Sequence, residues 1–157
     1  MEHLMLARID DRLIHGQVMT AWMKVRPAKQ IIVIDDKIAK DSFMIDVIQL
    51  AAPSGVKVHV LSCTDAIETL KKGLDTTTIL LAKTPATYKA LIDSDIDIKE
   101  INVGGMGMMQ GRKTLYKNIA ASDEERAIFK ELLDKKIDVK VQIIPANNAV
   151  AMTGLLK

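Results

Sequence analysis

The chain of 157 residues has little of what several classes of protein require. Aromatic residues make up only 3% of it, so the stacking platforms that bind single-stranded nucleic acid are nearly absent. Its one cysteine, Cys63, excludes an intramolecular disulfide and fits a reducing compartment. No apolar run approaches the roughly 20 residues that a membrane-spanning helix needs. These shortages favour a cytoplasmic protein that binds no nucleic acid and does not itself cross a membrane.

What the chain does contain is typical of one globular domain. Apolar residues make up 48% and charged residues 27%, and the charges are dispersed with a net value of only +2. Arg8 and Asp10 interrupt the N-terminal apolar stretch before the core of a signal peptide can form. We therefore expect a single domain over residues 1–157, long enough to bury roughly two-thirds of its unfolded surface.

Short β-branched runs alternate with helical patterns along the chain, which is typical of βαβ units. The expected strands cover residues 4–9, 30–35, 56–61, 77–82, 100–103 and 138–144. The expected helices cover residues 16–25, 41–51, 64–72, 85–92 and 123–135. Segment 112–121 fits either an edge strand or a loop, and the tail after Pro145 gives weak signals. The pattern predicts an α/β fold with an open, mostly parallel sheet and helices on both faces.

The segment RIDDRLIHGQV, residues 8–18, joins the first expected strand to the first expected helix. Ligands of open α/β sheets bind beyond the carboxyl ends of the strands, and His15 stands at such an end. A helix that begins near Gly16 offers unpaired N–H groups and a positive dipole end, which favour an anion. Glycine at this position also lets the backbone approach a phosphate closely. The placement indicates an anion site beside His15.

Two arginines upstream of the histidine suit phosphate recognition. Arg8 and Arg12 carry guanidinium groups that donate charge-assisted hydrogen bonds to phosphoryl oxygens. Their positive charge also disfavours a protonated imidazole and so keeps His15 nucleophilic near neutral pH. Asp10 is a candidate either to hold an arginine or to fix the imidazole tautomer. Asp11 fits a solvated residue or a turn former.

Other motifs either fail on spacing or fit a structural role equally well. A dinucleotide fingerprint that starts at Gly105 needs glycine where Gln110 stands, and a P-loop needs four residues, not five, between Gly105 and Gly111. The methionines of this segment fit either an adaptable contact surface or simple filling of the core. Cys63 stands at an expected helix start, where a thiol can be acidified or can serve as a small apolar residue. No set of histidine, cysteine or carboxylate residues has metal-ligand spacing.

Residues 8–18 resemble the active-site loop of enzyme IIB components of the bacterial phosphoenolpyruvate-dependent sugar phosphotransferase system. The similarity is to the mannose/fructose/sorbose family. Further matches follow in the order of the family, namely IVIDD (32–36), AAPSGVKV (51–58), KTP (83–85) and NVGGM (102–106). The resemblance covers essentially the whole chain and weakens after Pro145, and residues 108–110 match it least.

The resemblance implies a mostly parallel seven-stranded sheet, in which segment 112–121 would supply the extra strand. It also implies that His15 accepts a phosphoryl group from a IIA partner, on the ring nitrogen Nδ1. The group then passes to a sugar bound by the membrane components IIC and IID. The sugar itself is not readable from this chain, because its pocket belongs to the membrane partner. A homodimer is compatible with the sequence but nothing in it demands one.

We therefore expect a phosphotransferase that works through a phosphohistidine intermediate and needs no metal or other cofactor. The predicted site consists of His15 as nucleophile, Arg8 and Arg12 as charge stabilisers, Asp10 as an orienting group, and Gly16 and Gln17 as backbone donors. Two alternatives stay open. One is a non-catalytic α/β module that senses a phosphorylated metabolite through the same pocket. The other is a scaffold that phosphohistidine regulates without turnover.

Overall fold

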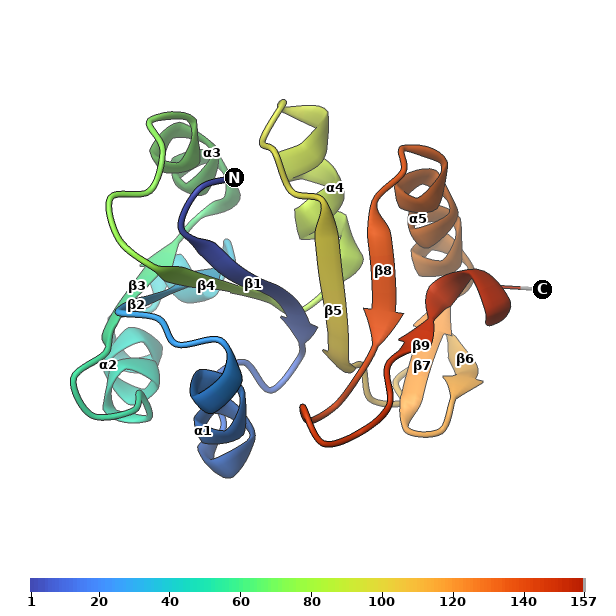
Figure 1. Ribbon diagram of the computed structural model, residues 1–157, viewed down its shortest axis with the longest axis horizontal. Coiled ribbons are helices and arrows are strands. Elements are labelled where there is room, and N and C mark those ends of the chain that lie inside the picture. The colour runs from blue at the N-terminus through green and yellow to red at the C-terminus, as the bar shows by residue number, and fades with distance from the viewer. Residues whose placement is uncertain (157) are drawn as a thin grey trace.

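A seven-stranded sheet with the order β3-β2-β4-β1-β5-β8-β9 crosses the computed structural model, which describes residues 1–156 (Figure 1). The parallel strands are β1 (Leu4–Asp10), β2 (Gln30–Ile34), β3 (Lys57–Leu61), β4 (Thr78–Ala82), β5 (Glu100–Gly105) and β8 (Asp138–Val141). The two-residue strand β9 (Val150–Ala151) adds to β8 in the antiparallel direction. The expected open and mostly parallel sheet is confirmed.

Helices cover both faces of the sheet, as expected (Figure 1). They are α1 (Gly16–Val25), α2 (Ser42–Leu50), α3 (Cys63–Lys71), α4 (Pro85–Asp93) and α5 (Asp123–Asp134). A short 3-10 helix, η1 (Ile38–Lys40), lies between β2 and α2, and a second, η2 (Met152–Gly154), follows β9. Side chains of α1 and α2 share one core cluster, and those of α3, α4 and α5 share the other. The central strand β4 is buried along its whole length because it has neighbours on both edges and helices on both faces.

The prediction that segment 112–121 supplies the seventh strand is wrong. Strands β6 (Arg112–Tyr116) and β7 (Ile119–Ser122) form a separate antiparallel hairpin instead. Its turn contains Lys117 in the left-handed region, with φ at 48°. The seventh strand is β9, which comes from the tail that gave only weak signals. A strand of two residues is too short to produce an alternating pattern, so periodicity had no means of finding it.

Strand order places the predicted loop at a point where connections diverge. The chain leaves β1 through α1 toward β2 on one side, whereas it leaves β5 toward β8 on the other side. Strands β1 and β5 are neighbours, and Arg8 pairs with Asn102 in their register. Such a divergence between adjacent strands is where open α/β sheets bind ligands, at the carboxyl edge.

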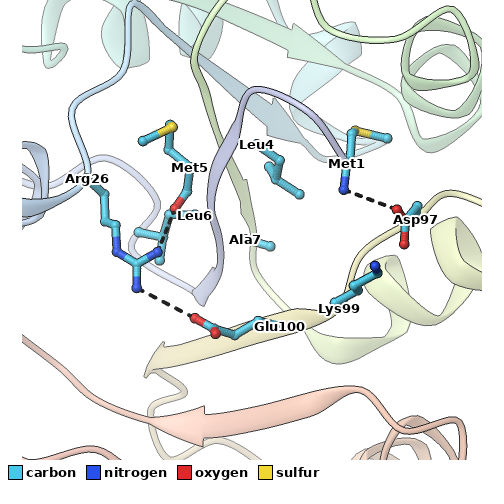
Figure 2. Close-up of a pocket in the computed structure, with 9 residues that line it drawn as sticks. All are labelled: Met1, Leu4, Met5, Leu6, Ala7, Arg26, Asp97, Lys99 and Glu100. Atoms are coloured by element: carbon cyan, nitrogen blue, oxygen red, sulfur yellow. Dashed lines mark hydrogen bonds and ion pairs between the residues drawn. The ribbon is translucent and has the colours of Figure 1, made fainter.

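At the opposite edge of the sheet, β1 and β5 separate and leave a cavity of about 190 Å³ (Figure 2). The charged groups around it pair with one another. The N-terminal ammonium lies 3.2 Å from Asp97, and Arg26 lies 3.8 Å from Glu100. This cavity is therefore at the amino ends of the strands, away from the predicted loop.

Candidate functional site

The loop between β1 and α1 is held in place by its own apolar residues. Leu13 has a positive φ of 58°, which is strained for a side chain of its size, and its N–H donates to the carbonyl of Asp10 at 2.9 Å. Leu13 and Ile14 are both buried in the core cluster that α1 and α2 share. Burial of these two side chains pins the loop and stabilises the strained turn. His15 follows directly and occupies the N-cap position of α1.

Helix α1 begins without a side-chain cap, unlike α2, α3 and α5. Gly16, with φ at 38°, and Gln17 are exposed residues of its first turn. Backbone N–H groups in a first turn have no intrahelical acceptor, so they remain available to an anion beside His15. The structure thus places His15 at the N-cap and Gly16 and Gln17 in the first turn of α1, as predicted, while their role as phosphate donors stays a prediction.

The two ring nitrogens of His15 have different environments. Nε2 is buried and has no hydrogen-bond partner within residues 1–156, whereas Nδ1 is not buried in this way. Burial and the positive charge of Arg12 lower the pKa of His15, although Asp10 opposes them. The imidazole is therefore neutral over a wider pH range than an ordinary histidine, and a neutral ring is the nucleophilic form.

Arg8 is not placed to touch a phosphate, contrary to the expectation from sequence. Its side chain is only 1% exposed, and each of its Nη atoms donates two hydrogen bonds. The acceptors are the Asn102 side chain, the Asp10 carboxylate and the carbonyls of Gln142 and Ile143. Arg8 therefore joins the ends of β1, β5 and β8 and supports the site from beneath.

Of the two roles left open for Asp10, the structure shows the first. Its buried carboxylate accepts bonds from the backbone N, the Nε and the Nη2 of Arg12 at 3.0, 3.0 and 3.1 Å, and also binds Arg8. Burial raises the pKa of Asp10, but the hydrogen bonds from Arg12 outweigh it and the pKa lies below its ordinary value. No hydrogen bond joins Asp10 to His15 in the described part of the chain. Asp10 thus positions arginines and does not fix the imidazole.

Arg12 is the arginine that remains available to a ligand. Its side chain is 47% exposed, although Nε and Nη2 are held by Asp10. Its Nη1 atom has no partner among the residues that the structure describes. A guanidinium fixed on one side and open on the other is suited to bind an oxyanion in a defined orientation.

The glycine pair at the end of β5 makes room for the arginine network. A Cβ on Gly104 would lie 1.9 Å from Cζ of Arg8, and a Cβ on Gly105 would lie 2.5 Å from Oδ1 of Asp10. These glycines therefore allow two side chains of β1 to lie against the backbone of β5. This close approach explains the glycine-rich segment without a nucleotide.

Asp11 is 28% exposed, so it is partly solvated as expected, but it also binds a distant segment, which the sequence did not predict. Its Oδ2 accepts the N–H of Gly107 at 2.8 Å and lies 3.5 Å from Nη1 of Arg112. Sequence reasoning missed Arg112, because the residues that it binds, Asp11 and Glu125, are distant from it in the chain. The methionines of the segment divide between the two interpretations: Met106 is buried, while Met108 and Met109 are exposed.

The single cysteine lies in a different cavity, of about 340 Å³, at the carboxyl ends of β2 and β4. Cys63 is the first residue of α3, yet burial and the negative charge of Asp36 raise the pKa of its thiol. The thiol is therefore not acidified, and the small apolar role fits it better. Within residues 1–156 no group of three histidine, cysteine or carboxylate side chains is placed to hold a metal ion. In the same range no helix has the length and apolar character needed to cross a membrane.

Comparison with known proteins finds relatives over nearly the whole chain. The family model described as the PTS system sorbose subfamily IIB component matches residues 4–157. The fructose-specific EIIB component of Bacillus subtilis is 33% identical over 159 residues, which covers 100% of this chain and 98% of that protein. The sorbose-specific EIIB component of Klebsiella pneumoniae is 36% identical over 140 residues, which covers 87% of this chain and 85% of that protein. The mannose-specific EIIAB component of Escherichia coli is 32% identical over 153 residues, but this chain spans only 47% of it.

Solved structures show the same likeness in three dimensions. The IIBSor domain of the sorbose permease from Klebsiella pneumoniae superposes with a TM-score of 0.92 at 31% identity, covering 98% of this chain and 95% of that one. The manxB structure from Thermoanaerobacter tengcongensis gives a TM-score of 0.87 at 38% identity, covering 96% of this chain and 92% of that one. Sequence and fold therefore point to the same group of proteins.

Proposed function

The chain belongs to the sorbose subfamily of IIB components of the sugar phosphotransferase system, and we propose that it carries phosphate on His15. In this proposal a IIA component donates the phosphoryl group from its own phosphohistidine. The acceptor is a sugar bound by the membrane components IIC and IID, so the protein works at the cytoplasmic face of a transporter. The observation that carries the proposal is the position of His15, a neutral imidazole at an uncapped helix start beside Arg12.

The first step exchanges one phosphorus–nitrogen bond for another. Nδ1 of His15 attacks the phosphorus while the bond to the donor imidazole breaks, and the electron pair of that bond returns to the donor ring. The proton that the donor ring takes up balances the one that His15 gives up. Burial of Nε2 favours Nδ1 as the attacking atom, because only an accessible nitrogen can approach the donor in line.

The second step returns His15 to its starting state. A sugar hydroxyl oxygen attacks the phosphorus, the bond from phosphorus to Nδ1 breaks, and the hydroxyl proton ends on the imidazole. In both steps Arg12 stabilises the charge on the three equatorial phosphoryl oxygens, and the N–H groups of Gly16 and Gln17 add to it. Asp10 acts through Arg12, whose guanidinium it holds in place, and Arg8 acts one step further away, through its bond to Asp10.

The test is transfer of labelled phosphate from a phosphorylated IIA component, such as the IIA part of the E. coli mannose-specific EIIAB protein. We expect one acid-labile and base-stable label on the wild type, on Nδ1 of His15, and none on His15→Ala. The matched control is Cys63→Ser, which should be labelled like the wild type because its thiol is not acidified. Label that survives in His15→Ala or disappears in Cys63→Ser would contradict the proposal.

The same assay separates the alternatives. A module that only senses a phosphorylated metabolite forms no covalent adduct, so it would remain unlabelled. A scaffold that phosphohistidine regulates would accept the label but would not lose it to sugar. Phosphorylated protein is therefore mixed with membranes that contain IIC and IID, and loss of the label on adding sugar is the expected result.

A further inference from the structure

A second arginine network lies beside the proposed phosphate site. Arg112, the first residue of β6, has a side chain that is only 4% exposed. Its Nε and Nη2 atoms each donate to one carboxylate oxygen of Glu125 at 2.9 Å, a bidentate pair. Its Nη1 atom donates to the carbonyl of Gly107 at 2.8 Å. Glu125 is fixed in turn, because its carboxylate also accepts the N–H of Ser122 in the capping box of α5.

Asp11 joins this network to the phosphate-binding loop. Its Oδ2 accepts the N–H of Gly107 at 2.8 Å and lies 3.5 Å from Nη1 of Arg112. The backbone N–H of Asp11 donates to the carbonyl of Gly105 at 3.0 Å. Residues 105–107 are therefore tied to Asp11 at two points and to Arg112 at one. Asp11 stands directly between Asp10 and Arg12 in the chain.

These bonds hold residues 104–107, and the side chain of Arg12 lies against this segment. The Nη2 atom of Arg12 is 3.5 Å from the carbonyl of Gly104 and would be 3.1 Å from a Cβ on Gly105. The carboxylate of Asp10, which orients Arg12, packs on the same backbone. Displacement of residues 104–107 would therefore move both the guanidinium and its orienting group.

We propose that Arg112 and Asp11 are positioning residues for phosphoryl transfer, which clamp residues 104–107 against the loop that carries His15. This inference rests on the proposed function and adds to it two residues outside the direct phosphate contacts. The clamp acts through Arg12, whose guanidinium must meet the phosphoryl oxygens in one orientation. Misplacement by about 1 Å is enough to slow a reaction up to a hundredfold.

Lysine in place of Arg112 tests the clamp with the charge kept. Lysine cannot reproduce the bidentate fork to Glu125 and the bond to Gly107 together. We expect Arg112→Lys to reduce the rate of phosphoryl transfer from IIA by about ten- to a hundredfold, in kcat more than in KM. We also expect NMR titration to give a higher pKa for His15, because a displaced Arg12 depresses it less.

Two further variants separate positioning from stability. Glu125→Gln keeps a side chain that can still cap α5, but it loses the charge that holds Arg112. We expect a smaller fall in the transfer rate and a smaller rise in the pKa of His15 than in Arg112→Lys. Arg126→Lys is the matched control. Arg126 lies at the same junction of hairpin and helix, yet its guanidinium donates only to carbonyls of residues 113, 114 and 121. This control should lower Tm without changing transfer or the pKa of His15.

The outcomes distinguish the clamp from the proposed function. Suppose that the wild type is labelled on His15, and that folded Arg112→Lys and Glu125→Gln have the same transfer rate and the same pKa of His15 as the wild type. The clamp is then wrong, and the proposed function stands. If the wild type is not labelled, the proposed function fails. In that case the NMR titration alone decides whether Arg112 positions Arg12. An unchanged pKa of His15 in both variants would show that it does not.

Discussion

At the scale of single residues, the site depends on how differently its two arginines are used. Arg8 is closed in by four acceptors, whereas Arg12 is held on one side and open on the other. Sequence alone treats the two alike, since both precede the histidine by a few positions. Arg8 and Asp10 lie on the same face of β1, which is buried on both faces there, and the chain turns after Asp10 and leaves Arg12 exposed. One arginine therefore builds the site and the other meets the ligand.

The pKa of His15 gives a first prediction at this scale. Burial and Arg12 lower it below the ordinary 6.5, so the neutral, nucleophilic ring persists as the pH falls through that value. The rate of labelling from a phosphorylated IIA component should therefore decline in acid with its inflection below pH 6.5. Arg12→Ala should shift the decline to higher pH and slow labelling, with far-UV circular dichroism unchanged. An inflection above 6.5 in the wild type would be incompatible with this environment.

Gly105 gives a second prediction. A Cβ there would lie 2.5 Å from Oδ1 of Asp10, and this oxygen cannot retreat because it is buried and bonded to Arg12. Gly105→Ala should therefore destabilise the fold by about 1–3 kcal/mol, as overpacking does, and reduce phosphoryl transfer. Chemical denaturation measures the first effect. Gly154→Ala is the control, since no atom of residues 1–156 lies within 4 Å of its added Cβ, and it should change stability by no more than about 0.5 kcal/mol.

At the scale of elements, α1 begins differently from most other helices. Helix α4 also lacks a side-chain cap bond, but it has proline in its first turn, which leaves one N–H fewer to satisfy. Asp41, Ser62 and Ser122 cap α2, α3 and α5 with side-chain hydrogen bonds. His15 stands at the same position of α1 and makes no such bond. Asparagine and serine are good N-caps and histidine is not, so the sequence gives up stability at α1 and leaves its N–H groups open.

His15→Asn should therefore stabilise the protein while it abolishes labelling. Asparagine accepts a bond from an N–H of the first turn, and a cap of this kind contributes about 0.5–2 kcal/mol to the free energy of unfolding. Urea denaturation monitored by the fluorescence of Trp22 measures the change. Ser122→Ala is the converse variant and should lose about 1 kcal/mol at α5. Equal or lower stability of His15→Asn would show that the start of α1 is not a stability deficit.

Hydrophobic pattern predicted nearly all of the parallel strands and the helices of this fold. Continuous β-branched runs mark strands buried on both faces, and β2 and β4 lie within a residue of their predicted bounds. The last parallel strand ends earlier than predicted, at Val141, because the carbonyls of Gln142 and Ile143 turn to Arg8. A tertiary contact of this kind leaves no trace in local periodicity.

The site was predictable where it is local in sequence and not where it is assembled from distant segments. His15, Gly16 and Arg12 lie within one loop, and the sequence placed them together. Apart from Asp10, the hydrogen-bond acceptors of Arg8 come from β5 and from residues after β8, more than 90 positions away. Arg112 reaches Asp11 only because the hairpin folds back beside β5. No spacing rule connects such residues, since strand order decides their proximity.

At the scale of the whole molecule, the buried arginine network ties three strands at their carboxyl ends. Asp10 is the negative charge that balances Arg8 inside this network. Removing one partner of a buried ion pair leaves the other uncompensated, which costs about 3–5 kcal/mol. Asp10→Asn should therefore lower the free energy of unfolding by about this amount at pH 7, measured in urea. Asp46→Asn, an exposed change on α2, is the control.

The pH dependence of this effect has a definite sign. The pKa of folded Asp10 lies below its ordinary 3.8, so its contribution is fully present above that value and is lost as the pH falls through the folded pKa. The stability gap between wild type and Asp10→Asn should narrow in acid below about pH 3.8. A gap that stays constant down to pH 2 would contradict the assignment of the carboxylate as the charged partner.

The unequal ring nitrogens of His15 have a consequence for how partners meet the protein. Because Nε2 is buried, under the proposed function both donor and acceptor must reach Nδ1, the same atom of the same ring. They must therefore take turns: the spent donor departs before the acceptor arrives, and no complex of all three exists on the route. Donor and acceptor therefore bind at one site in alternation, and the expected kinetics are ping-pong.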